Sequence, residues 1–186
     1  MKKILLGILY KAIHFLYTSD KRNLTLEVSE RNICARLAFH IENLMRLYDR
    51  KNGKEIFKNY FVDVEYNRME SIDGKPIKKS IIYQDNVCET IVCDLLVHSR
   101  GINKERDNLL ALEMKRTYNK DSIESDNKRL IRLISPPPEK EKNQTMYNTL
   151  LGVFLTCDKA SCVITVYEWD SESQTYRTLI SEKKII

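Results

Sequence analysis

Two apolar stretches decide how this chain folds: Ile91-Val92-Cys93-Asp94-Leu95-Leu96-Val97-His98 and Leu109-Leu110-Ala111-Leu112-Glu113-Met114-Lys115. Each is a short run rich in Leu and Val, with the length of a buried strand. A charged turn, Asn103 to Asn108, leads into the second run. Because the runs are close in sequence and separated by a turn, antiparallel pairing is the simplest arrangement. They therefore predict two neighbouring strands of one sheet.

Both predicted strands carry ionisable residues inside the apolar pattern. Burying a carboxylate among Leu and Val is costly unless it is paired or binds a metal. Glu113 and Lys115 share one face of their strand, because alternate residues of a strand point to the same side. The ordinary interpretations are a polar strand end for this pair and an ion-paired acid for Asp94. We favour a site, because an acid and a lysine beside a second acid are what a metal-dependent phosphodiesterase needs.

The bulk composition describes an ordinary globular protein and excludes few functions. The chain has 186 residues, of which 42% are hydrophobic and 31% charged, and we expect one domain over residues 1–186. Its net charge of +5 permits a polyanionic partner without requiring one. A P-loop phosphoryl-transfer enzyme is disfavoured, since only 5 glycines are present and no glycine-rich phosphate loop occurs.

Cysteine usage indicates a reducing compartment. The chain has 5 Cys, an odd number without dense spacing, which is typical of free thiols and of a cytoplasmic protein. The pairs Cys88/Cys93 and Cys157/Cys162 are spaced within reach of a zinc site. Cys93 and Cys162 lie in apolar strand patterns, however, where Cys acts as a small hydrophobe. We therefore favour thiols over zinc.

The first 20 residues resemble a signal peptide only superficially. Apolar residues recur at helical spacing over residues 2–18, but Lys11 and His14 interrupt the stretch and no small-residue cleavage site follows. The stretch is also too short to span a bilayer. We expect an amphipathic helix over residues 1–20 that packs on the domain, rather than a membrane anchor.

The remaining patterns predict an α/β protein with a mixed central sheet flanked by helices. Ser29 is an expected N-cap for a helix from about Glu30 to Tyr48. The other expected elements are a strand over Tyr60–Met69, a helix over Ser125–Ile134, strands over Leu150–Thr156 and Cys162–Trp169, and an edge strand within Thr175–Ile186. Polar loops are expected around Asp73-Gly74 and over residues 139–145.

Phosphodiester hydrolysis needs an activated water, neutralised charge on the phosphate and help for the leaving oxygen, which Mg²⁺ can supply. Because Mg²⁺ takes a few carboxylates and keeps several waters, Asp94 and Glu113 are its expected ligands, with the Met114 backbone carbonyl as a further one. Mn²⁺ is an expected substitute. Lys115 would hold or deprotonate the attacking water and stabilise the phosphate charge. Glu30 either reaches the metal or complements the helix dipole.

An acid before a turn, followed by Glu-x-Lys in the next strand, resembles the signature of the PD-(D/E)xK nuclease superfamily. Ser29-Glu30-Arg31 and the segment Val62 to Arg68 add to the resemblance, which is greatest to small uncharacterised bacterial members and spans about residues 29 to 169. It implies a restriction-endonuclease-like αβββαβ core with an extra N-terminal helix. It also implies a catalytic set of Asp94, Glu113 and Lys115, with Glu30 as a helix-borne fourth member. Cys93 departs from the pattern, because the family name has Pro there.

Further residues are candidates for contact with a nucleic acid, for which DNA is the expected substrate. They are His98, Arg100, Asn67 and Lys128. Solvated polar positions are the ordinary interpretation of each. The resemblance thus leads to a Mg²⁺-dependent deoxyribonuclease, and the alternative is a catalytically inactive nuclease-fold binding or regulatory module. Whether the chain acts alone, as a homodimer or beside a partner subunit stays open.

Overall fold

The computed structural model describes residues 1–70, 75–78, 80–82, 88–90, 92–117, 123–137 and 148–185. Over these residues, helices come first and a mixed six-stranded sheet follows, with one helix inserted between its strands. The helices are α1 (Lys2–Ser19), α2 (Lys21–Thr25), α3 (Glu30–Asn52) and α4 (Ile123–Ile134). The sheet strands are β1 (Phe61–Val64), β6 (Leu95–His98), β7 (Asn108–Arg116), β8 (Leu151–Cys157), β9 (Ser161–Asp170) and β10 (Thr175–Ile185). The predicted mixed α/β architecture is confirmed.

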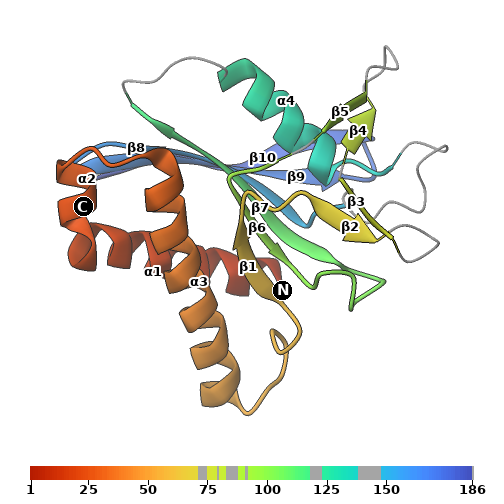
Figure 1. The fold of residues 1–186 in the computed structure, drawn as a ribbon, viewed down its shortest axis with the longest axis horizontal. Coiled ribbons are helices and arrows are strands. Elements are labelled where there is room, and N and C mark those ends of the chain that lie inside the picture. Colours follow the sequence, from red (N-terminus) through yellow and green to blue (C-terminus); the bar gives the residue numbers. More distant parts are fainter. Residues whose placement is uncertain are drawn as a thin grey trace.

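The sheet order is β1-β6-β7-β8-β9-β10, and helices lie on both of its faces (Figure 1). β6 and β7 pair antiparallel, with Leu96 opposite Ala111, as the two apolar stretches predict. β7 and β8 are parallel, and α4 connects them. Such a parallel connection needs a crossover, which the helix supplies. α4 packs closely on β8, since a Cβ on Gly152 would lie 3.2 Å from Cγ2 of Ile134.

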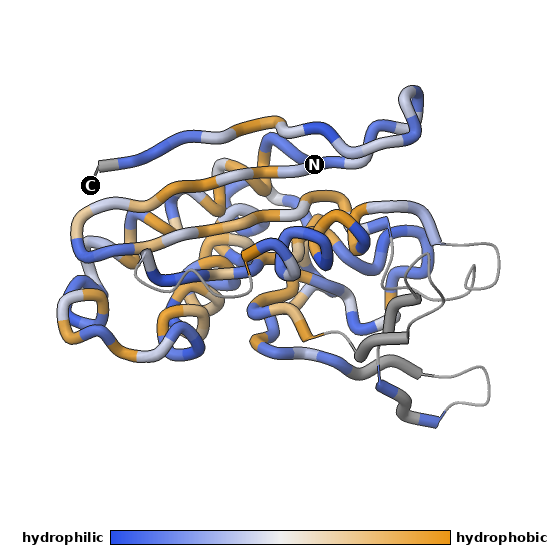
Figure 2. Tube along the Cα trace, turned by 90° about the horizontal axis from the view of Figure 1, so that it is seen from above, coloured by the Kyte–Doolittle hydropathy of each residue, from blue (hydrophilic) through white to orange (hydrophobic). Residues whose placement is uncertain are grey.

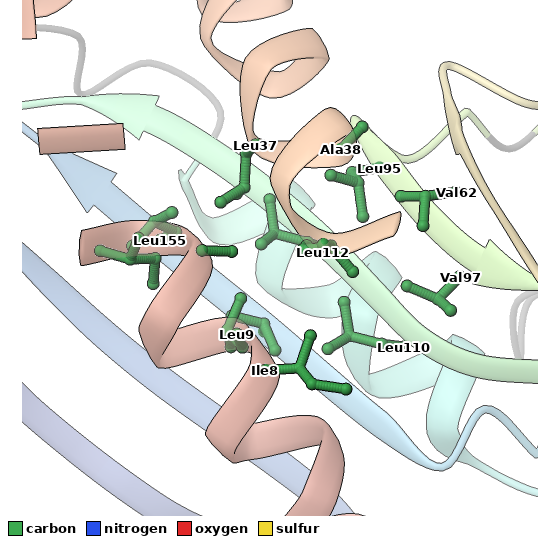
Figure 3. Close-up of a cluster of buried hydrophobic side chains, with 14 of the residues drawn as sticks. Ile8, Leu9, Leu37, Ala38, Val62, Leu95, Val97, Leu110, Leu112 and Leu155 are labelled. Carbon is green, nitrogen blue, oxygen red and sulfur yellow. The ribbon is translucent and has the colours of Figure 1, made fainter. Parts of the chain in front are cut away.

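The larger core lies between the sheet and helices α1 and α3. Figure 3 shows Ile8 and Leu9 of α1 and Leu37 of α3 directed at Leu110 and Leu112 of β7. A smaller core on the opposite face joins α4 to residues of the sheet, and its buried members are Cys93, Leu96, Ala111, Leu130, Leu133 and Phe154. Because β7 lies between these two cores, its successive side chains face different helices.

Helix α1 belongs to the main core, as expected for the amphipathic N-terminal segment. Its buried side chains recur at helical spacing and are Leu5, Ile8, Leu9, Ala12, Ile13, Leu16 and Tyr17. The apolar residues accordingly concentrate where the helices meet the sheet (Figure 2). Over the described part of the chain, no helix is both long and apolar enough to cross a membrane.

Helix α3 begins where its cap predicts. The Ser29 hydroxyl accepts a hydrogen bond from the Asn32 backbone N–H at 3.3 Å, which satisfies one of the first-turn donors. The helix runs one turn beyond the expected end at Tyr48, to Asn52. Gly53 ends it with a left-handed φ of 57°. The cap fixes Glu30 at the first position of the helix, close to the end of β7.

Three local expectations are wrong. The strand expected over Tyr60–Met69 is divided, because Glu65 has a positive φ of 53° and separates β1 from β2 (Arg68–Glu70). Asp94 directly precedes β6 instead of lying within a strand. The short strands that follow β2 were not expected: β2 pairs with β3 (Pro76–Lys78), and β4 (Ser80–Ile82) pairs with β5 (Cys88–Thr90). Helix α2 was also not expected.

The C-terminal strands form as predicted. β8 and β9 pair antiparallel, and β10 completes the edge of the sheet beside β9. The expected loops at Asp73-Gly74 and over residues 139–145 lie outside the described residues.

Candidate active site

The expected site residues gather at the C-terminal end of β7, where β6 no longer pairs with it. The first residue of β6, Leu95, lies opposite Leu112, so β7 continues beyond its neighbour. Two carboxylates, one from Asp94 and one from Glu30, each accept a hydrogen bond from the backbone of this extension. Asp94 Oδ2 accepts from the Met114 N–H at 2.7 Å, and Glu30 Oε1 accepts from the Arg116 N–H at 2.8 Å. The two acids thus satisfy backbone donors that a longer β6 would have paired.

The side chains of Glu113 and Lys115 contact α4, which covers the face of the sheet opposite to α1 and α3. Arg129 Nη1 of α4 donates to Glu113 Oε1 at 2.6 Å. Lys115 Nζ lies 3.0 Å from Asp126 Oδ2, and Arg129 Nη2 lies 3.2 Å from Asp126 Oδ1. The shared strand face of Glu113 and Lys115 is the one expected from strand alternation. The structure therefore brings Asp94, Glu113, Lys115 and Glu30 to one place.

Glu113 is held in an environment that disfavours its charge. It is only 2% exposed. Burial, followed by the charge of Asp94, raises its pKa to about 8, even though Arg129 favours the ionised form. Burial likewise raises the pKa of Asp94, against the opposing effect of the Met114 N–H. Since a hydrogen bond also links Asp94 and Glu113, the two carboxyls form a pair that resists double ionisation.

Lys115 remains a cation. Its burial opposes the charge, but the hydrogen bond and charge of Asp126, together with the charges of Glu30 and Asp94, raise its pKa above the ordinary value. The distance from Lys115 Nζ to Glu30 Oε2 is 3.9 Å. The lysine therefore supplies a fixed positive charge between helices α3 and α4, beside the buried carboxyl pair.

The carboxylate oxygens of this cluster are the type of ligand that Mg²⁺ prefers. Mg²⁺ binds through one or two carboxylates and keeps much of its water, which matches the close pair of Asp94 and Glu113. A divalent ion would also relieve the charge repulsion that raises the Glu113 pKa. In the described ranges no group of three or more His, Cys, Asp or Glu side chains is already arranged to hold a metal. The fit thus rests on a two-carboxylate site, completed by water and backbone oxygen.

Two of the expected nucleic-acid contacts form a separate cluster around Asp63 of β1. His98 Nε2 lies 2.9 Å from Asp63 Oδ2, and Arg100 donates to both carboxylate oxygens at 2.6 and 2.8 Å. These hydrogen bonds hold the pKa of Asp63 well below its usual range, although burial alone would raise it. His98 is 0% exposed, so in this conformation it is a buried partner of Asp63 instead of a surface contact. Arg100 is exposed and stays a candidate.

The other two expected contacts lie apart from the carboxyl pair. Lys128 is on the outer side of α4, where its side chain is 65% exposed and pairs with Glu124 at 2.7 Å. Asn67 is half-buried in the segment between β1 and β2. Among the described residues, the partners found for Asp94, Glu113 and Lys115 include neither Lys128 nor Asn67.

Sequence reasoning missed Asp126 and considered Arg129 only as a contact for a nucleic-acid backbone, whereas both residues complete the cluster. Their positions relative to the apolar side of α4 carried a signal, because Asp126 is four residues before buried Leu130 and Arg129 is three residues after Asp126. Asp126 is buried, and an acid on the apolar face of a helix needs a cationic partner. One partner, Arg129, lies on the same helix, but the other, Lys115, comes from β7, which the helix pattern alone does not identify.

No disulfide joins the cysteine side chains that the structure describes. Cys34, Cys93, Cys157 and Cys162 are all buried and unbonded to one another, and Cys157 lies opposite Cys162 across β8 and β9. The side chain of Cys88 lies outside the described atoms, so the Cys88/Cys93 spacing is not tested.

Comparisons with protein-family models, with curated proteins and with solved structures find no match to this chain. The case for a function therefore rests on the geometry and the chemistry of the cluster at the end of β7.

Proposed function

We propose that the chain is a Mg²⁺-dependent nuclease that hydrolyses phosphodiester bonds, with DNA as its substrate. The observation that carries the proposal is the pair of half-buried Asp94 and buried Glu113 beside the cation Lys115. Burial raises the pKa of both carboxyls, and the charge of Asp94 raises the pKa of Glu113 further. Such a pair next to a lysine is costly to the fold and is typical of a catalytic site. Mg²⁺ bound there would polarise the phosphate and lower the pKa of a bound water.

The residues have separable roles in this proposal. Asp94 and Glu113 provide the oxygen ligands, and the carbonyl of Met114, the residue after Glu113, is a further one. Lys115 acts through its charge, because its raised pKa keeps it protonated and so unsuited to accept a proton from water. It stabilises negative charge that develops on the phosphate. Asp126 fixes the direction of the lysine, at 3.0 Å from Nζ.

The order of elements supports the family resemblance. From α3 onward the sheet's helices and strands follow as α3, β1, β6, β7, α4 and β8, with β1–β6 and β6–β7 antiparallel and β7–β8 parallel. This is the αβββαβ order of the PD-(D/E)xK superfamily, with α1 as an addition. If the chain shares this fold, Asp94 and the Glu113-x-Lys115 motif correspond to the acid and the Glu-x-Lys of the family's signature.

Cleavage of DNA tests the proposal directly. The pure protein is incubated with supercoiled and linear DNA and with RNA, each with Mg²⁺ or Mn²⁺ and with a chelator. We expect metal-dependent cleavage of DNA that is lost in Asp94→Asn and Lys115→Ala but kept in the control Lys58→Ala, since Lys58 is an exposed lysine that pairs with Glu55. Cleavage that is equal in all four proteins would refute the assignment.

A second candidate is an inactive binding or regulatory module of the same fold. One observation favours it: both key side chains already have partners on α4, because Arg129 binds Glu113 and Asp126 binds Lys115. Such a module would bind nucleic acid or a partner protein without turnover. Mg²⁺ binding that depends on Asp94 and Glu113 separates the two candidates, because an inactive module has no need of it.

A further inference from the structure

Arg129 binds the carboxylate that the proposed metal site would use. It is the cation that the structure sets on Glu113, at 2.6 Å from Oε1, and its side chain is 19% exposed. We propose, on the basis of the nuclease function above, that Arg129 is a resident counter-cation. It occupies Glu113 in the metal-free protein and leaves Glu113 when Mg²⁺ binds.

The charge balance around Glu113 supports this role. Asp94 and Asp126 both act on Glu113 as negative charges, while Arg129 favours its ionised form. Lys115 lies against Asp126 and Glu30. Arg129 is therefore the cation that lies between Glu113 and Asp126, at 2.6 Å from one carboxylate and 3.2 Å from the other. Arg129 therefore keeps the site assembled before an ion arrives.

Arg129 and Mg²⁺ exclude one another at Glu113, because both are cations that use the same carboxylate. A proton competes for Glu113 as well, but it carries one positive charge and Mg²⁺ carries two. By Coulomb's law the guanidinium therefore opposes the ion about twice as strongly as it opposes the proton. Removing its charge should increase Mg²⁺ affinity, even though the pKa of Glu113 then rises further.

The exchange has a short path. Arg129 Nη2 is already 3.2 Å from Asp126 Oδ1, one helical turn earlier on α4. The guanidinium can thus leave Glu113 and keep a carboxylate partner without movement of the helix. Asp126 would then hold Arg129 and Lys115 together, and both positive charges would stay beside the carboxyl pair.

Calorimetric titration of the full chain with Mg²⁺ at pH 7.5 tests this inference without requiring cleavage. We expect Arg129→Gln to bind Mg²⁺ about tenfold more tightly than the unmodified chain, within the range usual for coupling between two sites. Arg129→Lys keeps the charge and should stay near the unmodified affinity. Lys128→Gln is the matched control, because it removes one positive charge from the exposed side of the same helix.

The rise in melting temperature on addition of Mg²⁺ gives a second readout, and it should be larger in Arg129→Gln. Equal or weaker Mg²⁺ binding by Arg129→Gln would overturn the inference and leave the nuclease proposal standing. Absence of Mg²⁺ binding from the unmodified chain and from every variant would overturn both. Tighter binding in Lys128→Gln to the same extent would also overturn the inference, because it would show a general effect of net charge.

Discussion

Replacement of either of two buried glutamates by glutamine should change the free energy of unfolding of this protein in opposite directions. Glu113 and Glu168 are each 2% exposed. Burial and Asp94 raise the pKa of Glu113 from 4.5 to about 8, whereas Lys2 and Arg177 hold the pKa of Glu168 below its ordinary value against the effect of burial. Glu113→Gln keeps a side-chain oxygen to accept from Arg129 and removes only the disfavoured charge.

The size of the effect follows from proton linkage. Between about pH 4.5 and about pH 8 the folded protein holds a proton on Glu113 that the unfolded chain releases, so stability falls as the pH rises through this range. At 1.36 kcal/mol for each pKa unit, the loss is roughly 3 kcal/mol by pH 7. Glu113→Gln should therefore raise the free energy of unfolding by roughly 2–3 kcal/mol at pH 7 and change it little at pH 4.5.

Urea unfolding in chelator, followed by fluorescence of the single tryptophan, Trp169, measures this difference. Glu168→Gln is the control and should lower stability at pH 7 by roughly 1–3 kcal/mol, because its charged hydrogen bonds are lost. A loss of stability in Glu113→Gln at pH 7 would refute the reasoning. Glu113 would then be one half of a stabilising ion pair with Arg129, with no need for a metal.

Three further substitutions test separate parts of the structure. Lys115→Met should reduce the rate of DNA cleavage by about 100-fold or more, with Mg²⁺ affinity in calorimetry kept or increased, because the lysine acts on the phosphate charge. Asp63→Asn should lower the free energy of unfolding at pH 7 by roughly 2 kcal/mol, since His98 and Arg100 lose their anion. It should also flatten the loss of stability in acid, because a depressed pKa contributes stability that disappears as the pH falls. Leu37→Ala, fully buried in the main core, should cost about 2–5 kcal/mol in denaturant unfolding without changing Mg²⁺ affinity.

The predictable parts of this fold are those with strong local patterns. The apolar run of β7, the Ser29 cap of α3 and the apolar side of α4 each follow from local spacing, so the sequence locates them and their order. The antiparallel pairing of β6 and β7 follows from the short turn between them. Strand alternation also predicts that Glu113 and Lys115 share a face.

The parts that were missed depend on contacts between distant segments. The apolar run around Asp94 reads as one strand, but the Asp94 carboxylate itself binds the Met114 N–H where the ladder of β6 would otherwise continue. Arg129 and Asp126 belong to the site only because the crossover of α4 places them over the end of β7. The left-handed φ of Glu65, which divides the expected strand, is uncommon for a residue other than glycine. No local sequence pattern predicts these features.

The central claim is that Asp94 and Glu113 together hold one Mg²⁺ ion. Calorimetric Mg²⁺ titration at pH 7, repeated in buffers of different ionisation enthalpy, counts the protons released on binding. Because Glu113, with a pKa of about 8, is protonated in the metal-free protein and must ionise to bind, release of about one proton per ion is predicted. Asp94→Asn and Glu113→Gln should abolish this binding. Mg²⁺ binding that both variants retain, or binding without proton release, would contradict the account.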